Sequence, residues 1–151
     1  MKLSVASDHA GFLLKGRVID ELRRMGNEVI DLGPDREIPG DDYPDYAKAV
    51  AHSVTSGQVE RGVLLCGSGA GVSVAANKFK GIRAATCHDS FSARQCVEDD
   101  NVNVLCLGPR VIGAELAIVL LRDYIDARFS GAERHRRRLA KVAGFEEQFG
   151  K

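Results

Sequence analysis

Several features that would place a chain in a broad class are missing from this sequence of 151 residues. The formal net charge is zero, with 21 basic and 21 acidic residues, which disfavours a general nucleic-acid binder. No apolar run is long enough to span a bilayer, and the stretch after Met1 lacks the apolar segment and cleavage site of a signal peptide. We therefore expect a cytoplasmic protein with neither a membrane nor a nucleic acid as its partner.

Cysteine is scarce and irregularly spaced. The four cysteines stand at positions 66, 87, 96 and 106, and no two of them form a Cys-x-x-Cys pair. This spacing predicts reduced thiols, not a disulfide framework or a zinc site, and we expect no metal. Internal repeats, low-complexity tracts and linkers are absent too, so residues 1–151 are expected to form a single domain.

The two common glycine motifs of nucleotide-binding proteins are also absent. No Gly-x-x-x-x-Gly-Lys-Ser/Thr occurs, and Gly67, Gly69 and Gly71 do not fit Gly-x-Gly-x-x-Gly because Val72 stands where the last glycine belongs. Asp89 does lie about twenty residues further on, where a ribose-binding acid would sit. A nucleotide- or sugar-phosphate-binding module without turnover therefore remains an alternative.

The most informative stretch present is an apolar run, Val63–Leu65, that ends in Cys66 and continues into three glycines and a helical pattern. Glycines let the backbone approach a ligand closely, and the N–H groups at a helix N-terminus attract anions. Such a setting favours a thiolate. Cys66 is thus a candidate base or nucleophile that faces an anion site, the alternative being a buried structural cysteine.

Short apolar runs alternate with helical patterns along the whole chain. Strands that are apolar throughout suit a parallel sheet covered on both faces. We predict a doubly wound α/β domain with a five-stranded parallel sheet in the order 2-1-3-4-5, helices on both faces and an extra C-terminal helix. The expected strands are 2–7, 28–32, 62–66, 83–87 and 104–107, and the expected helices after the first are 46–56, 72–79, 90–98, 113–127 and 134–149.

In that order the chain reverses direction between the first and third strands, and ligands bind beyond the carboxyl ends at such a point. The segments there are Asp8-His9 and Cys66-Gly67, which strengthens the functional interpretation of Cys66. Asp8 could also serve only as a helix cap.

A basic run, Arg134-His135-Arg136-Arg137-Arg138, opens the last expected helix. Such runs are usually solvated faces or nucleic-acid patches. Arg134 and Arg138 are four residues apart and would share one helical face, where two guanidinium groups can clamp a phosphate. Arg110, in the loop after the fifth strand, could join them.

Ordered motifs extend over almost the whole length of the chain. They are Ser7-Asp8-His9-Ala10-Gly11-Phe12, Asp42-Tyr43-Pro44-Asp45-Tyr46, Cys66-Gly67-Ser68-Gly69-Ala70-Gly71, Ala75-Ala76-Asn77-Lys78, Gly81-Ile82-Arg83-Ala84-Ala85, Asn103-Val104-Leu105, Gly108 with Arg110, and Arg134-His135 with Arg138. Together they resemble the type B ribose-5-phosphate isomerases, the family that also holds the galactose-6-phosphate isomerase subunits. The resemblance implies an aldose–ketose isomerase of sugar phosphates without metal or cofactor. It also implies a homodimer or a dimer of dimers, with a site shared between subunits.

The resemblance further implies a role for each matching residue. Cys66 corresponds to the base that moves a proton between C1 and C2, Ser68 to the hydroxyl beside it, and Asp8 to a contact with sugar hydroxyls. The amides at 69–71 correspond to an anion hole, and the histidine and arginines to the phosphate site. The expected substrate-binding positions are His9, Tyr43, Gly67, Gly69, Ala70, Gly71, Asp100, Arg110, Arg134 and Arg138.

The sequence departs from the family at Asp99-Asp100, where many members carry His-Asn. That histidine is the family's ring-opening residue, so Asp99 stands at a catalytic position with different chemistry. His88, after the fourth expected strand, could replace it or could be a surface-loop histidine. Ribose 5-phosphate is the simplest expected substrate, and a tetrose 4-phosphate or hexose 6-phosphate is the alternative.

Overall fold

The protein is described by a computed structural model that covers residues 1–150, and its strands form one parallel sheet. The order in the sheet is β2-β1-β3-β5-β4. The α/β class and the five parallel strands are confirmed. The strands are β1 (Lys2–Ser7), β2 (Glu28–Asp31), β3 (Arg61–Leu65), β4 (Ala84–Thr86) and β5 (Val104–Leu107).

The predicted order of the last two strands is wrong, because β5 and not β4 pairs with β3. All four residues of β5 are fully buried, whereas the three residues of β4 are only partly buried and lie at the sheet edge. The more apolar strand removes more surface from water in the inner position. After β3 the chain therefore forms β4 at the edge of the sheet, and β5 then takes the position between β3 and β4.

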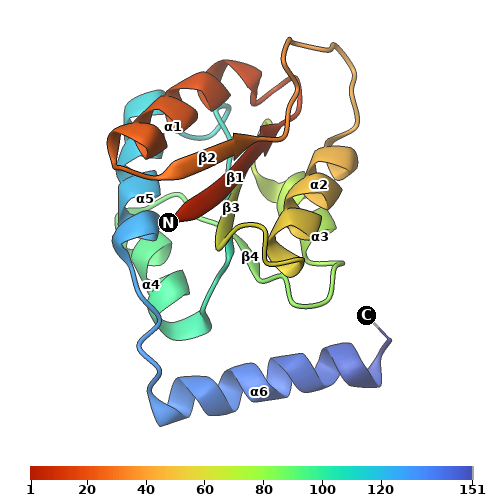
Figure 1. Cartoon of the computed structure of the whole chain (residues 1–151), viewed down its shortest axis with the longest axis vertical. Coiled ribbons are helices and arrows are strands. Elements are labelled where there is room, and N and C mark those ends of the chain that lie inside the picture. Colours follow the sequence, from red (N-terminus) through yellow and green to blue (C-terminus); the bar gives the residue numbers. More distant parts are fainter. Residues whose placement is uncertain (151) are drawn as a thin grey trace.

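Helices cover both faces of the sheet, and one more lies across the end of the domain (Figure 1). No helix within residues 1–150 is long and apolar enough to cross a lipid bilayer. On one face lie α1 (Phe12–Arg24), α4 (Ser90–Asp100) and α5 (Ala114–Asp126), on the other α2 (Tyr43–Thr55) and α3 (Ala70–Ala76), and α6 (Glu133–Gln148) is the helix across the end.

Alternate strand residues point into two separate apolar cores. Leu3 and Val5 of β1 pack under α1, α4 and α5, whereas Ala6 packs under α2 and α3. The same two-residue period puts Leu65 in the first core and Cys66 in the second. The thiol of Cys66 therefore lies on the side of the sheet that α2 and α3 cover.

Two helices begin earlier than their sequence patterns predict. The helix α2 starts at Tyr43 and not at Tyr46, because Pro44 fits the first helical turn, where a missing N–H leaves no bond unmade. The helix α3 starts at Ala70 and not at Val72, since Gly69 takes a φ of 82° and caps it. Both shifts bring first-turn residues to the carboxyl edge of the sheet.

Candidate active site

Three loops meet beyond the carboxyl ends of β1, β3 and β5. The Asp8 N–H donates to the Leu65 carbonyl at 3.1 Å, and the Arg110 N–H donates to the Gly67 carbonyl at 3.0 Å. The chain reverses between β1 and β3, as predicted, and ligands of such sheets bind beyond the carboxyl ends at this point. The corrected strand order is what puts the β5 loop directly against the Cys66 loop.

Two glycines allow these loops to touch. A Cβ atom on Gly108 would lie 2.3 Å from the backbone of Ser68, and one on Gly11 would lie 2.7 Å from the backbone of Leu65. Real Cβ atoms do not approach backbone so closely, so any larger residue would push the loops apart. The backbone around the thiol is therefore held by contacts that only glycine permits.

The thiol of Cys66 is buried at this edge, 5% exposed, and its sulfur accepts the Gly69 N–H at 3.1 Å. The Ser68 hydroxyl is exposed and accepts the Ala70 N–H at 3.4 Å. Thr86, the last residue of β4, fixes the turn, because its hydroxyl donates to the Gly69 carbonyl at 3.1 Å. All four cysteines are free thiols, as predicted. The turn thus directs the Gly69 N–H to the sulfur and the Ala70 N–H to the neighbouring hydroxyl, and backbone donors of this kind suit an anion.

Asp8 and His9 follow β1 at the same edge, and both are held by hydrogen bonds. Asp8 is 6% exposed, and its carboxylate accepts the Gly11 N–H at 3.0 Å, which holds the turn before α1; the N-cap of that helix is Gly11, so Asp8 is not its cap. The His9 ring contacts Asp41, whose Oδ1 lies 2.7 Å from Nδ1. Sequence reasoning missed Asp41, because an acidic loop residue carries no local sign that it pairs with a histidine 32 positions earlier.

Tyr43 and Arg110 lie over the glycine turn. A Cβ atom on Gly71 would be 3.1 Å from the Tyr43 ring, and one on Gly67 would be 3.1 Å from the Arg110 guanidinium. These short approaches show an aromatic ring on one side of the turn and a positive charge on the other. The structure therefore brings Asp8, His9, Tyr43, the 66–71 turn and Arg110 to one edge.

The other predicted residues lie at the opposite end of the sheet. Asp99 and Asp100 end α4, which leads into the amino end of β5, and Arg134 and Arg138 belong to α6 (Figure 1). A four-residue strand such as β5 spans about 13 Å. Within one chain the two arginines therefore do not reach Cys66, and Arg110 does not join them.

A buried histidine organises this second group. His135 is 2% exposed, and its Nδ1 lies 3.1 Å from Asp99 Oδ1 while its Nε2 accepts the Arg134 Nε–H at 2.7 Å. Gln95 donates to the other oxygen of Asp99 at 3.1 Å. The His135 ring therefore connects Asp99, the predicted ring-opening residue, with Arg134 of the predicted phosphate clamp.

The fold and the first edge define an α/β protein with a buried thiol and a glycine turn at a topological switch point, where ligands of such sheets bind. The family model for Ribose/Galactose Isomerase matches residues 3–142. Ribose-5-phosphate isomerase B of Escherichia coli is 40% identical over 97% of both chains, and D-erythrulose-4-phosphate isomerase of Pectobacterium atrosepticum is 40% identical over 87% of this chain and 86% of that protein. Ribose-5-phosphate isomerase B of Mycoplasma genitalium, solved with bound ribulose-5-phosphate, is 39% identical and superposes with a TM-score of 0.92 over 97% of this chain and 96% of that one. This chain belongs to the ribose/galactose isomerase family and is an aldose–ketose isomerase of sugar phosphates.

Proposed function

We propose that this enzyme interconverts ribose 5-phosphate and ribulose 5-phosphate through an enediolate, with Cys66 as the base. The observation that carries the proposal is the buried Cys66 sulfur at the switch point, 3.1 Å from the Gly69 nitrogen, with the loops after β1 and β5 bonded to the residues on either side of Cys66. The relatives from E. coli and M. genitalium support the five-carbon substrate by their activity and bound ligand.

The chemistry assigned to each group follows from its atoms. The thiolate of Cys66 takes the proton from C2 of the open-chain aldose and returns it to C1, while the hydroxyl proton on O2 passes to O1. The negative charge that develops on the substrate oxygen is met by backbone N–H groups of residues 69–71, where the Gly69 and Ala70 N–H groups contact the Cys66 sulfur and the Ser68 hydroxyl before substrate binds. Asp8 and Ser68 orient the sugar hydroxyls.

The phosphate is held, in this proposal, by residues from two subunits. His9 and Arg110 lie on the same edge as Cys66. Arg134 and Arg138 come from a second copy of the chain, because within one chain these two arginines lie at the opposite end of the sheet from Cys66. Guanidinium groups bind phosphate with paired, charge-assisted hydrogen bonds. We therefore propose a homodimer in which each site combines residues of both subunits.

A tetrose 4-phosphate is the second candidate substrate, and Asp99 favours it. Its carboxylate is held by Gln95 and His135 at a position where the opening of a cyclic sugar needs a proton donor. A tetrose whose O4 carries the phosphate cannot close a five-membered ring, so it needs no such donor. The relative from P. atrosepticum is named for a substrate of this kind.

The test is Cys66→Ala, assayed on sugar phosphates of four, five and six carbons. We expect turnover to fall by about a thousandfold or more, the upper range for loss of a general base, while calorimetry shows substrate binding within a few-fold of the parent. Cys106→Ala removes another buried thiol of the same core and is expected to keep turnover. Near-normal turnover in Cys66→Ala would exclude the thiol as the base.

A further inference from the structure

Asp41 holds His9 with one carboxylate oxygen and is itself held through the other. Its Oδ1 accepts the His9 backbone N–H at 2.9 Å and lies 2.7 Å from His9 Nδ1. Its Oδ2 accepts the Tyr46 hydroxyl at 2.7 Å. The Asp41 side chain is 8% exposed, whereas that of His9 is 33% exposed. A nearly buried carboxylate thus fixes a ring that solvent and ligands can reach.

The surroundings keep this carboxylate ionised. Burial acts to raise the pKa of Asp41, but the hydrogen bonds from the His9 N–H, the Tyr46 hydroxyl and the His9 ring outweigh it and leave the pKa below its usual range. Burial, and then the hydrogen bond to Asp41, raise the pKa of Tyr46 to about 12, so Tyr46 stays a donor. The negative charge of Asp41 is therefore shielded by three donors from an anion bound at His9.

The allocation of the ring nitrogens follows from this geometry. With Nδ1 engaged by Asp41, Nε2 is the nitrogen left for a ligand, and the bond the other nitrogen makes decides what each can do. The second bond, from the His9 backbone, also ties the turn after β1 to the loop before α2. Removing Asp41 would free both the ring and its backbone.

We propose that Asp41 is a positioning residue for phosphate binding, which sets His9 with Nε2 toward the phosphate of the substrate. This inference rests on the proposed function, in which His9 contacts the phosphate. Tyr46 supports the arrangement from α2, and the neighbouring acids Asp8 and Asp45 add no hydrogen bond to the His9 ring. Asp41 itself need not touch the substrate, so its removal should weaken binding and spare the proton transfer at Cys66.

The experiment compares Asp41→Ala, Asp41→Asn, His9→Ala and the double variant His9→Ala/Asp41→Ala in the full-length enzyme. KM, kcat and the inhibition constant of inorganic phosphate are measured, the last because it reports on the phosphate site alone. We expect Asp41→Ala to raise KM and the phosphate inhibition constant roughly 3- to 10-fold, the effect of one positioning hydrogen bond, with kcat within about threefold. Asp41→Asn keeps an acceptor for His9 and should recover part of the loss. Asp35→Ala, an exposed acid of the same loop, is the matched control and should match the parent.

The double variant distinguishes a positioning role of Asp41 from a merely structural one, because effects that act through His9 do not add. If Asp41 acts mainly through the His9 ring, the loss in the double variant falls well short of the product of the two single losses. A loss in kcat with KM unchanged, or effects of the two substitutions that multiply in full, would overturn the inference while His9→Ala still supports the phosphate site. If His9→Ala leaves both constants at parental values, the assignment of His9 is wrong and the inference is overturned with it. Asp41→Asn, with thermal melting as a check, decides the matter should Asp41→Ala fold poorly.

Discussion

At the scale of single residues, Asp99 bears on the proposed choice of substrate, because it stands at the position predicted to open a cyclic sugar. Gln95 donates to one of its oxygens, and the other lies 3.1 Å from His135 Nδ1. An ionised carboxylate accepts hydrogen bonds but has no proton to give. Ribose 5-phosphate is mostly a closed furanose, and opening it requires a proton to be removed from one oxygen and another to be delivered to the ring oxygen.

We therefore predict that Asp99→His raises kcat/KM for ribose 5-phosphate by about tenfold or more, because a histidine can both accept and donate a proton near neutral pH. The value for a tetrose 4-phosphate should change little. Asp99→Asn is the control, since it removes the charge without adding a group that titrates. Steady-state kinetics on both sugars test this prediction. It is wrong if the parent's kcat/KM for ribose 5-phosphate already equals that of histidine-containing relatives and Asp99→His does not raise it.

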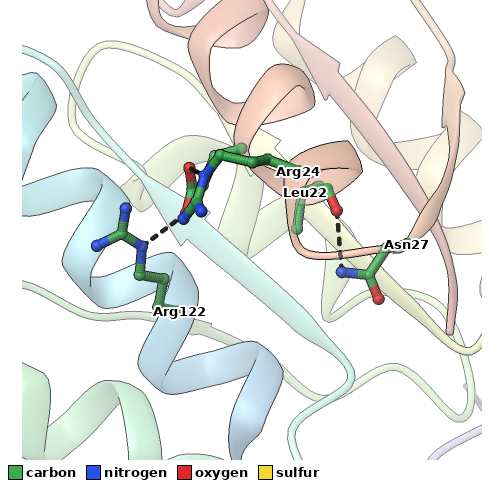
Figure 2. A network of polar contacts seen from close by, with 5 residues as sticks. Leu22, Arg24, Asn27 and Arg122 are labelled. Atoms are coloured by element: carbon green, nitrogen blue, oxygen red, sulfur yellow. Dashed lines mark hydrogen bonds and ion pairs between the residues drawn. The ribbon is translucent and has the colours of Figure 1, made fainter.

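At the scale of secondary-structure elements, Glu21 joins α1 to α5 at the surface of one core. Arg24 of α1 contacts both of its oxygens, at 2.8 and 2.7 Å, and Arg122 of α5 contacts one of them at 2.6 Å. Figure 2 shows the side chains of Arg24 and Arg122 extending toward one another from the two helices. The hydrogen bonds from Arg24, and then those from Arg122, lower the pKa of Glu21 from 4.5 to about 2.

A lowered native pKa makes stability depend on pH in a definite direction. The stabilisation from Glu21 is fully present above the unfolded value near 4.5 and is lost as pH falls through about 2. We predict that Glu21→Gln lowers the Tm at pH 7 and that the variant then loses less Tm than the parent between pH 5 and pH 2.5. Glu115→Gln, whose partner Arg17 and own side chain are exposed, should behave as the parent in both respects. If the Tm of the parent and of Glu21→Gln fell equally between pH 5 and pH 2.5, the stabilising role of ionised Glu21 would be contradicted.

At the scale of the whole molecule, the predicted site residues form two groups at opposite ends of the sheet. The thiol and the glycine turn after it lie beyond the carboxyl ends, whereas Asp99 and the α6 arginines lie beyond the amino ends. The helix α6 extends along that far end, away from the Cys66 turn (Figure 1). Two copies that face each other in opposite senses would bring one group of each into one site, which is the arrangement of a two-fold dimer.

We predict that a mixture of Cys66→Ala and Arg138→Ala chains recovers activity that neither variant has alone at low substrate concentration. Random exchange makes half of the dimers hybrid, and each hybrid has one intact site, so recovery should approach about a quarter of parental activity. Mass spectrometry of differently tagged chains confirms the exchange. Verified hybrids that remain as inactive as the separate variants would place the whole site within one chain.

Short-range patterns in the sequence were sufficient for the α/β class and for the turn around Cys66. Apolar runs mark buried parallel strands, and a thiol followed by Gly67, Gly69 and Gly71 marks a strand that ends in a helix N-terminus, because both signals depend only on neighbouring residues. The ligand-binding edge between β1 and β3 follows from the same alternation of strands and helices.

Only the tertiary structure decided which distant segments meet. The place of β5 beside β3 depends on which strand buries more apolar surface, and it is this pairing that brings Arg110 over Gly67. The contact of Asp41 with His9 and the separation of Arg134 and Arg138 from Cys66 depend on how loops and α6 are arranged around the sheet. Such contacts join residues far apart in the chain, so they cannot be predicted from the properties of neighbouring residues.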